Sequence, residues 1–178
     1  MAASSSKNDL PKLFVYDLDY TLWRCWCDTH ITPPIKAHPT EPGTAIKDRY
    51  GSEMAFYPDV PGIIADLSST KNVQIAAASR THAPDLARAM LSLLHIDGRR
   101  AIDHFSVLEI YPDSKITHFK ALHEKTGIAY ADMIFFDDES RNKEVERKLG
   151  VKFVLVRNGL SRKLHDRAVA EWRRERRV

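Results

Sequence analysis

Short apolar runs alternate with helix-like segments over most of this chain. Five runs have the length and composition of buried strands, and the segments between them repeat apolar residues at helical spacing. Strands that alternate with helices predict a parallel sheet with helices on both faces, an α/β fold of the Rossmann-like, doubly wound type. The predicted strands are 13–16, 73–78, 105–110, 133–136 and 152–156, and the predicted helices are 62–67, 84–94, 114–125 and 140–149.

Residues 22–61 interrupt this alternation directly after the first strand. Prolines and glycines recur through the segment, which excludes a long helix. We therefore expect a short insertion, with 24–27 and 54–57 paired as a small hairpin, and no full cap domain. The whole of 11–178 is predicted to be one domain, preceded by a disordered lead-in over 1–10.

Residues 161–178 are predicted to form a basic helix with one docked face, because Leu164, Ala168 and Trp172 are four residues apart. The segment holds seven basic and three acidic residues and so has a net charge of +4, whereas the remaining residues sum to −1 and the whole chain to +3. Such a helix can contact nucleic-acid phosphates, but a solvated face is the favoured interpretation, so we do not expect a nucleic-acid partner.

The remaining composition is that of a soluble globular protein, with 43% hydrophobic and 29% charged residues. No apolar stretch approaches the ~20 residues of a membrane span, and the start has no apolar core of a secretory signal. Cys25 and Cys27 are too close for an unstrained disulfide, and their spacing to His30 and His38 does not match zinc fingers. We expect a monomer in the cytoplasm, or in the nucleus.

Two carboxylates, Asp17 and Asp19, come directly after the first strand. Alternation along an extended backbone sends both to the same side, where their repulsion must be offset by a cation or a proton. A calcium loop is excluded because its sixth position, which requires glycine, is Leu22. The pair therefore indicates a metal site with acid chemistry beside it.

Other polar residues follow the later strands. Ser79 and Arg80 follow the second strand, Asp137 and Asp138 follow the fourth, and Lys115 lies in the first turn of a helix. Each residue alone can be explained as a helix cap or a solvated side chain. Because the carboxyl ends of parallel strands share one edge of the sheet, we expect these residues to lie together in one site. A lysine in a first turn also opposes the helix dipole unless an anion is near.

The chemistry of this set is that of a metal and a phosphate. Oxygen ligands without cysteine or histidine favour Mg²⁺, and a hydroxyl with an ammonium group suits phosphate. The glycine-rich loops that bind nucleotides are absent from the sequence.

The chain resembles the haloacid dehalogenase superfamily of phosphotransferases over about 13–156. The resemblance rests on the order of four motifs along the chain: D-x-D-x-T, Ser, Lys and Asp-Asp. The wider strings YDLDYTLW (16–23), AAASRT (76–81) and FFDDE (135–139) are most similar to the magnesium-dependent phosphatase-1 family. This resemblance implies a Mg²⁺-dependent phosphatase in which Asp17 attacks phosphorus to form an aspartyl phosphate. Asp19 would protonate the leaving group and then deprotonate the attacking water.

The resemblance also implies the remaining roles. Mg²⁺ would be held by Asp17, the backbone carbonyl of Asp19 and one member of the later pair, with Asp138 favoured as ligand and Asp137 behind it. The implied substrate-binding residues are Leu18, Asp19, Trp26, Ser79, Arg80 and Lys115. For Arg80 a surface position is an equal alternative, and Lys120, in mid-helix, is the less favoured alternative to Lys115.

A short insertion leaves the site open to a phosphorylated small molecule or protein. The resemblance implies phosphotyrosine in proteins and amine-linked sugar phosphates as candidate substrates. Tyr20, Trp23 and Trp26 are candidates for an aromatic rim, and core packing is the alternative for each. A non-catalytic phospho-binding module and a nucleic-acid end phosphatase are the alternative functions. A binding module needs no proton donor and a dehalogenase needs none either, so Asp19 favours a phosphatase.

Overall fold

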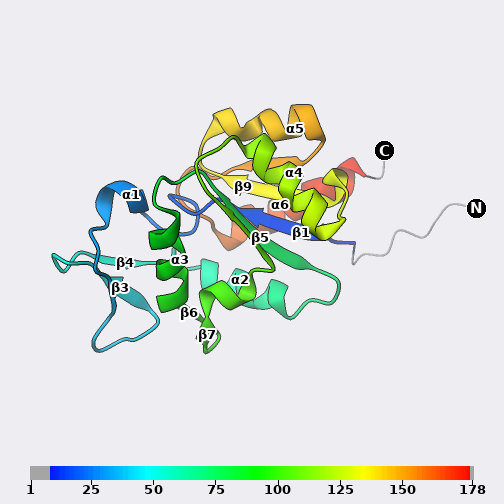
Figure 1. Cartoon of the computed structure of the whole chain (residues 1–178). Helices are drawn as coiled ribbons and strands as arrows, with labels where there is room; N and C mark the ends of the chain where they lie inside the picture. Colours follow the sequence, from blue (N-terminus) through cyan, green and yellow to red (C-terminus); the bar gives the residue numbers. More distant parts are fainter. Residues whose placement is uncertain (1–8, 177–178) are drawn as a thin grey trace, which may run out of the picture.

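The computed structural model describes residues 9–176, and its centre is a five-stranded sheet (Figure 1). The strand order is β10-β9-β1-β5-β8, and every neighbouring pair is parallel. The predicted α/β architecture is therefore confirmed. The strands are β1 (Leu13–Tyr16), β5 (Gln74–Ser79), β8 (Val107–Ile110), β9 (Met133–Asp137) and β10 (Lys152–Leu155).

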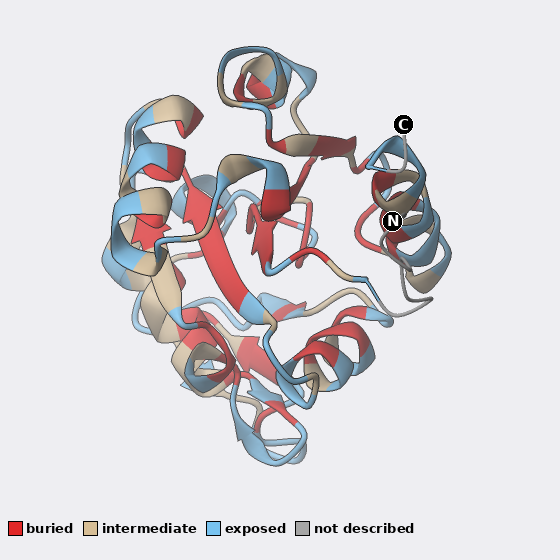
Figure 2. Cartoon of the chain, turned by 90° about the vertical axis from the view of Figure 1, so that its right-hand side faces the viewer, coloured by how far each residue is buried: buried red, intermediate tan, exposed pale blue. Residues whose placement is uncertain are grey.

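Helices cover both faces of the sheet, and the side chains of β1 alternate between these two faces. Phe14 and Tyr16 pack into one apolar cluster, whereas Leu13 and Val15 pack into the other. All four side chains are fully buried, as expected for a central strand with two covered faces. Figure 2 shows these buried strands surrounded by helices whose outer faces are exposed. The first face carries α2 (Val60–Ser68), α3 (Pro84–Leu93) and α6 (Arg162–Glu175), and the second carries α4 (Lys115–Thr126) and α5 (Glu144–Leu149).

The insertion is small, but its predicted hairpin is wrong. Its sheet is antiparallel and joins β2 (Lys36–Ala37), β3 (Ala45–Lys47) and β4 (Glu53–Ala55). Residues 24–27 instead lead into a single helical turn, α1 (Cys27–His30), and only Trp23 forms an isolated bridge to Phe56. Only Trp23 pairs with this side of the insertion, because the chain bends at residues 24 and 25 and enters α1 at Cys27.

Two further details depart from the sequence pattern. The predicted helix 140–149 begins as a 3₁₀ turn, η3 (Ser140–Lys143), and Ser140 does not cap it. The carboxylate of Asp137 instead accepts the Glu139 N–H at 2.7 Å. A second hairpin, β6 (His95–Ile96) with β7 (Arg99–Arg100), turns through Asp97-Gly98, where both φ angles are positive. The 3₁₀ turns η1 (Ala101–His104) and η2 (Tyr130–Asp132) complete the described elements.

The predicted basic helix is α6, and its cations hold it to the body of the protein. Arg173 donates to the carbonyl of Asp9, and Arg176 pairs with Asp132 at 2.6 Å. Asp9 and Asp132 precede β1 and β9, so these contacts lie at the amino ends of the strands. Within 9–176, none of the helices combines the length and apolarity that a bilayer crossing requires.

Candidate active site

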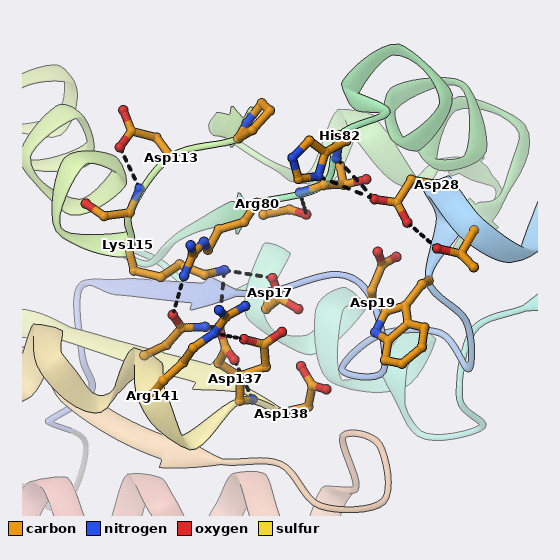
Figure 3. A pocket seen from close by; sticks show the side chains of 18 residues that line it. Asp17, Asp19, Asp28, Arg80, His82, Asp113, Lys115, Asp137, Asp138 and Arg141 are labelled. Atoms are coloured by element: carbon orange, nitrogen blue, oxygen red, sulfur yellow. Dashed lines mark hydrogen bonds and ion pairs between the residues drawn. The ribbon is translucent and has the colours of Figure 1, made fainter.

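A cavity of about 580 Å³ lies at the opposite, carboxyl edge of the sheet (Figure 3). The ends of β1, β5 and β9, the start of α4 and the insertion all contribute to its wall. Nearly every residue that the sequence analysis placed in the site lines this cavity: Asp17, Asp19, Trp26, Ser79, Arg80, Lys115, Asp137 and Asp138. The exception is Leu18, whose side chain is fully buried in the core, so only its backbone can serve the site.

Lys115 lies at the centre of the site, with a side chain only 1% exposed. Its Nζ is 2.7 Å from Asp17 Oδ1 and 3.1 Å from Asp137 Oδ2, and it also donates to the Ala78 carbonyl. Ser114 caps α4 by accepting the Thr117 N–H, which fixes the turn that carries Lys115. Burial alone would lower the pKa of Lys115, but Asp17 and Asp137 outweigh it and raise the pKa, so the ammonium form is held.

Three carboxylates are close enough to hold a cation. Oxygens of Asp17, Asp137 and Asp138 all lie within 4.8 Å of one another, and Figure 3 shows them converging on one point. One ammonium group faces these three acids, so the site has an excess of negative charge. Burial, Asp137 and Glu139 raise the pKa of Asp138 to about 7, and burial raises that of Asp17 against the opposing effect of Lys115. The donor set fits a divalent cation that prefers oxygen.

Asp137 and Asp138 differ in how far their oxygens are already engaged. Asp137 is fully buried, and it accepts the Glu139 N–H at 2.7 Å and the Asn142 side-chain amide at 2.9 Å, besides pairing with Lys115. These donors occupy much of its capacity, which favours Asp138 as the direct ligand.

Asp19 lies across the cavity from the carboxylate cluster. Its Oδ1 accepts the indole N–H of Trp23 at 2.7 Å, and burial raises its pKa, which favours a proton-carrying role. Trp23 is fully buried and stacks on Phe56, so of its two interpretations the structure supports core packing, and its indole N–H holds Asp19. Tyr20 lines a neighbouring cavity, which leaves Trp26, 50% exposed, as the aromatic side chain at this cavity's mouth.

The loop after β5 supplies hydroxyl and guanidinium groups. Ser79 is 2% exposed, and its Oγ accepts the Thr81 N–H at 3.3 Å, so it does not cap α3. Arg80 Nη1 donates to Asn142 Oδ1 at 3.4 Å, which turns this side chain into the cavity. Arg80 therefore lies at the cavity wall and not on a surface away from the site.

Sequence reasoning missed several residues of the cavity wall, among them Asn142 and Asp28. Asn142 is 2% exposed and bridges Asp137 to Arg80; the only signal was a polar residue one turn after the Asp-Asp pair. Asp28, from the insertion, accepts the His82 N–H at 3.2 Å across the cavity mouth. No sequence pattern links residues 54 positions apart.

The two cysteines take no part in this chemistry. Both are free and buried, and burial raises the pKa of Cys25 to about 12 and that of Cys27 further. A thiol with so high a pKa is not a nucleophile near neutral pH. Across 9–176, the one cluster able to hold a metal is the three-aspartate group, so nothing in this range supports a zinc site.

Comparison with known proteins agrees with this geometry. The family model described as "Acid Phosphatase" matches residues 9–175. A HAD-like hydrolase superfamily protein of Schizosaccharomyces pombe is 49% identical over 150 residues, covering 82% of this chain and 86% of its own. Human magnesium-dependent phosphatase 1 is 47% identical over 152 residues, covering 85% and 81%.

Solved structures show the same fold at low sequence identity. The N-terminal part of a Bacteroides fragilis protein, which contains a phosphatase domain and was solved with Mg, has a TM-score of 0.57 at 15% identity; the match covers 93% of this chain and 39% of that one. A haloacid dehalogenase-like hydrolase of Streptococcus pneumoniae has a TM-score of 0.56 at 12% identity, covering 86% and 89%. The chain therefore belongs to the acid phosphatase family of HAD-like hydrolases, together with magnesium-dependent phosphatase 1.

Proposed function

We propose that this protein is a Mg²⁺-dependent phosphomonoesterase that works through an aspartyl-phosphate intermediate. The observation that carries the proposal is the buried Lys115 ammonium between Asp17 and Asp137, with Asp138 completing a carboxylate cluster. The name of the human relative supports the metal and the reaction class. Asp17 and Asp138 would hold Mg²⁺ together with the backbone carbonyl of Asp19.

The side chains can carry out the reaction in two steps. Asp17 attacks phosphorus while the bond to the leaving oxygen breaks, and Asp19 gives its proton to that oxygen. Water then attacks the phosphorus of the aspartyl phosphate, Asp19 takes a proton from the water, and inorganic phosphate leaves. Ser79, Arg80 and Lys115 bind the phosphate oxygens and stabilise transition-state charge. The metal, when bound, would reduce the repulsion between the Asp17 carboxylate and the phosphate dianion.

The substrate is proposed to be a phosphotyrosine side chain of a protein or an amine-linked sugar phosphate. The insertion is small and leaves the cavity mouth open, and the half-exposed Trp26 offers a flat surface to either leaving group. Trp26→Ala should raise KM for an aryl phosphate, and an unchanged KM would contradict this contact.

The alternative of a nucleic-acid end phosphatase is not favoured. Arg173 and Arg176 are engaged with Asp9 and Asp132 at the amino ends of the strands, the edge of the sheet opposite to the cavity. Deleting residues 173–178 should therefore leave RNA and DNA affinity little changed, whereas a large loss would revive this alternative.

The deciding experiment is hydrolysis of para-nitrophenyl phosphate with and without Mg²⁺. The wild type should turn over only with Mg²⁺, and Asp17→Asn should be inactive under both conditions. Asp85→Asn, an exposed carboxylate in α3, is the matched control and should behave as wild type. An inactive wild type that still binds inorganic phosphate would support the non-catalytic binding module instead.

A further inference from the structure

A single helical turn carries the aromatic side chain at the mouth of the cavity. Trp26 lies directly before α1 and lines the cavity, and His30 is the last residue of the same turn. We propose that His30 is a positioning residue, which holds the indole of Trp26 against the leaving group without itself touching the substrate. This inference rests on the proposed phosphatase function and concerns its leaving-group side.

Both backbone polar groups of Trp26 are tied to this turn. Its N–H donates to His30 Nδ1 at 3.0 Å, and its carbonyl accepts the N–H of His30 at 2.8 Å and that of Thr29 at 3.1 Å. The arrangement is reciprocal, like a capping box in which a side chain reaches back to the first residue of a helix. Because Nδ1 accepts, the imidazole must be neutral and carry its proton on Nε2.

The rings are packed as well as the backbone. The Trp26 and His30 rings stack with centroids 5.5 Å apart and planes 13° apart. Tyr20 meets the Trp26 ring edge-on at 5.3 Å and the His30 ring at 6.5 Å. Tyr20 directly follows Asp19 in the chain, and its φ of 55° lies in the left-handed region. Its ring contacts therefore connect the backbone next to Asp19 with the rings of Trp26 and His30. Aromatic contacts of this kind fix the orientation of an exposed ring.

The turn itself is anchored to the loop that carries the phosphate-binding residues. Cys27 Sγ lies 3.2 Å from Thr81 Oγ1, and Asp28 Oδ2 accepts the His82 N–H at 3.2 Å. These contacts fix α1 relative to that loop, and thereby the indole relative to a bound phosphate.

His30 faces away from the catalytic cavity. It lines a neighbouring hollow of about 370 Å³ together with Tyr20, Arg24 and Glu53. Arg24 and Glu53 are the charged groups on that side, and Asp28 is the acid on the same helical turn. His30 can therefore affect substrate affinity only through its neighbours, Trp26 or Tyr20, and the double variant described below separates the two.

The test compares a substrate that reaches Trp26 with one that does not. For His30→Ala, KM for para-nitrophenyl phosphate should rise about three- to tenfold, with kcat within about twofold, because the aryl group loses an ordered aromatic contact. Acetyl phosphate has no aryl group, so both of its constants should stay near the wild-type values. In a Trp26→Ala background, His30→Ala should cause no further rise in KM.

Three results would overturn the proposal: an unchanged KM for the aryl phosphate in His30→Ala, an equal rise for acetyl phosphate, or an equal rise in the Trp26→Ala background. The first denies the effect, and the other two assign it to the fold as a whole.

Fluorescence provides a readout that does not depend on activity. The emission of Trp26, taken as the difference between wild type and Trp26→Phe, should be quenched more strongly by acrylamide in His30→Ala than in wild type, because the indole loses its stacked partner. His30→Phe, which keeps a flat ring, should retain the wild-type quenching, and equal quenching of wild type and His30→Ala would contradict the contact. An inactive wild type that shows the expected difference in quenching would reject the phosphatase proposal alone.

Discussion

Replacing Lys115 with methionine is the most direct test of the charge balance in the site. Methionine is unbranched like lysine, is one atom shorter, and carries no charge. At an effective dielectric constant of about 20, the 2.7 Å and 3.1 Å contacts to Asp17 and Asp137 correspond to gross attractions of about 6 and about 5 kcal/mol. Desolvation of the three groups offsets most of this, and removing one partner of a buried ion pair typically costs about 3–5 kcal/mol.

We therefore expect Lys115→Met to lower the free energy of unfolding by about 3–5 kcal/mol in the presence of EDTA. The variant should also lose about 10²–10³ in kcat, because a preorganised charge near the phosphate is missing. Mg²⁺ should stabilise the variant more than the wild type, since the cation then neutralises carboxylates that no ammonium group faces. Urea denaturation with EDTA and with Mg²⁺ measures both stability effects.

Lys120→Met is the matched control, because Lys120 lies in the same helix and is exposed. Its effect on the free energy of unfolding should stay within about 0.5 kcal/mol. A loss below about 1 kcal/mol in Lys115→Met would refute the reasoning, because it would mean that the two carboxylates need no ammonium group between them.

Three further predictions concern the neighbours of this centre. Asp19→Asn should lower kcat for an alkyl phosphate by about 10²–10⁴, while an aryl phosphate still gives a burst of nitrophenolate because that group leaves unprotonated; a missing burst would contradict the assigned order of steps. Asn142→Ala should lower the free energy of unfolding by about 1–3 kcal/mol and raise KM, since Asp137 and Arg80 lose a shared partner; urea denaturation and initial rates would show both, and no change in either would exclude the bridging role. Burial lowers the pKa of His118 to about 4, so the unfolded state binds its proton first as the pH falls, and stability should decrease between about pH 6.5 and 4 by at most about 3 kcal/mol. His118→Phe should flatten that decline in urea denaturation, and an unchanged slope would assign it to other groups.

The sheet and the convergence of the site follow from local patterns in the sequence. Period-two alternation over 13–16 sends neighbouring side chains into two separate clusters, which requires layers on both faces. Once the strands are parallel, their carboxyl ends must share an edge, and Asp17, Ser79 and Asp137 meet there. Lys115 was predictable for a different reason, because its conflict with the helix dipole called for a nearby anion.

The insertion could not be predicted in the same way. Its strands are two or three residues long, too short to show a period, and their pairing depends on contacts between distant segments. The role of Trp23 shows the same limit, since its sequence position fits a rim or a core residue equally well. Packing against Phe56 buries it and turns its N–H toward Asp19. Long-range packing of this kind leaves no local signal.

The position of β1 in the sheet has a consequence for how the chain is made. Both neighbours of this central strand come much later in the sequence, since β5 begins at residue 74 and β9 at residue 133. During synthesis, about 120 further residues must therefore be made after β1 before its second neighbour, β9, is available. Closing a loop of this length costs conformational entropy, which opposes the pairing until the strand contacts form. The same order exposes an unpaired apolar strand on the nascent chain, so folding intermediates of this protein should be its most aggregation-prone species.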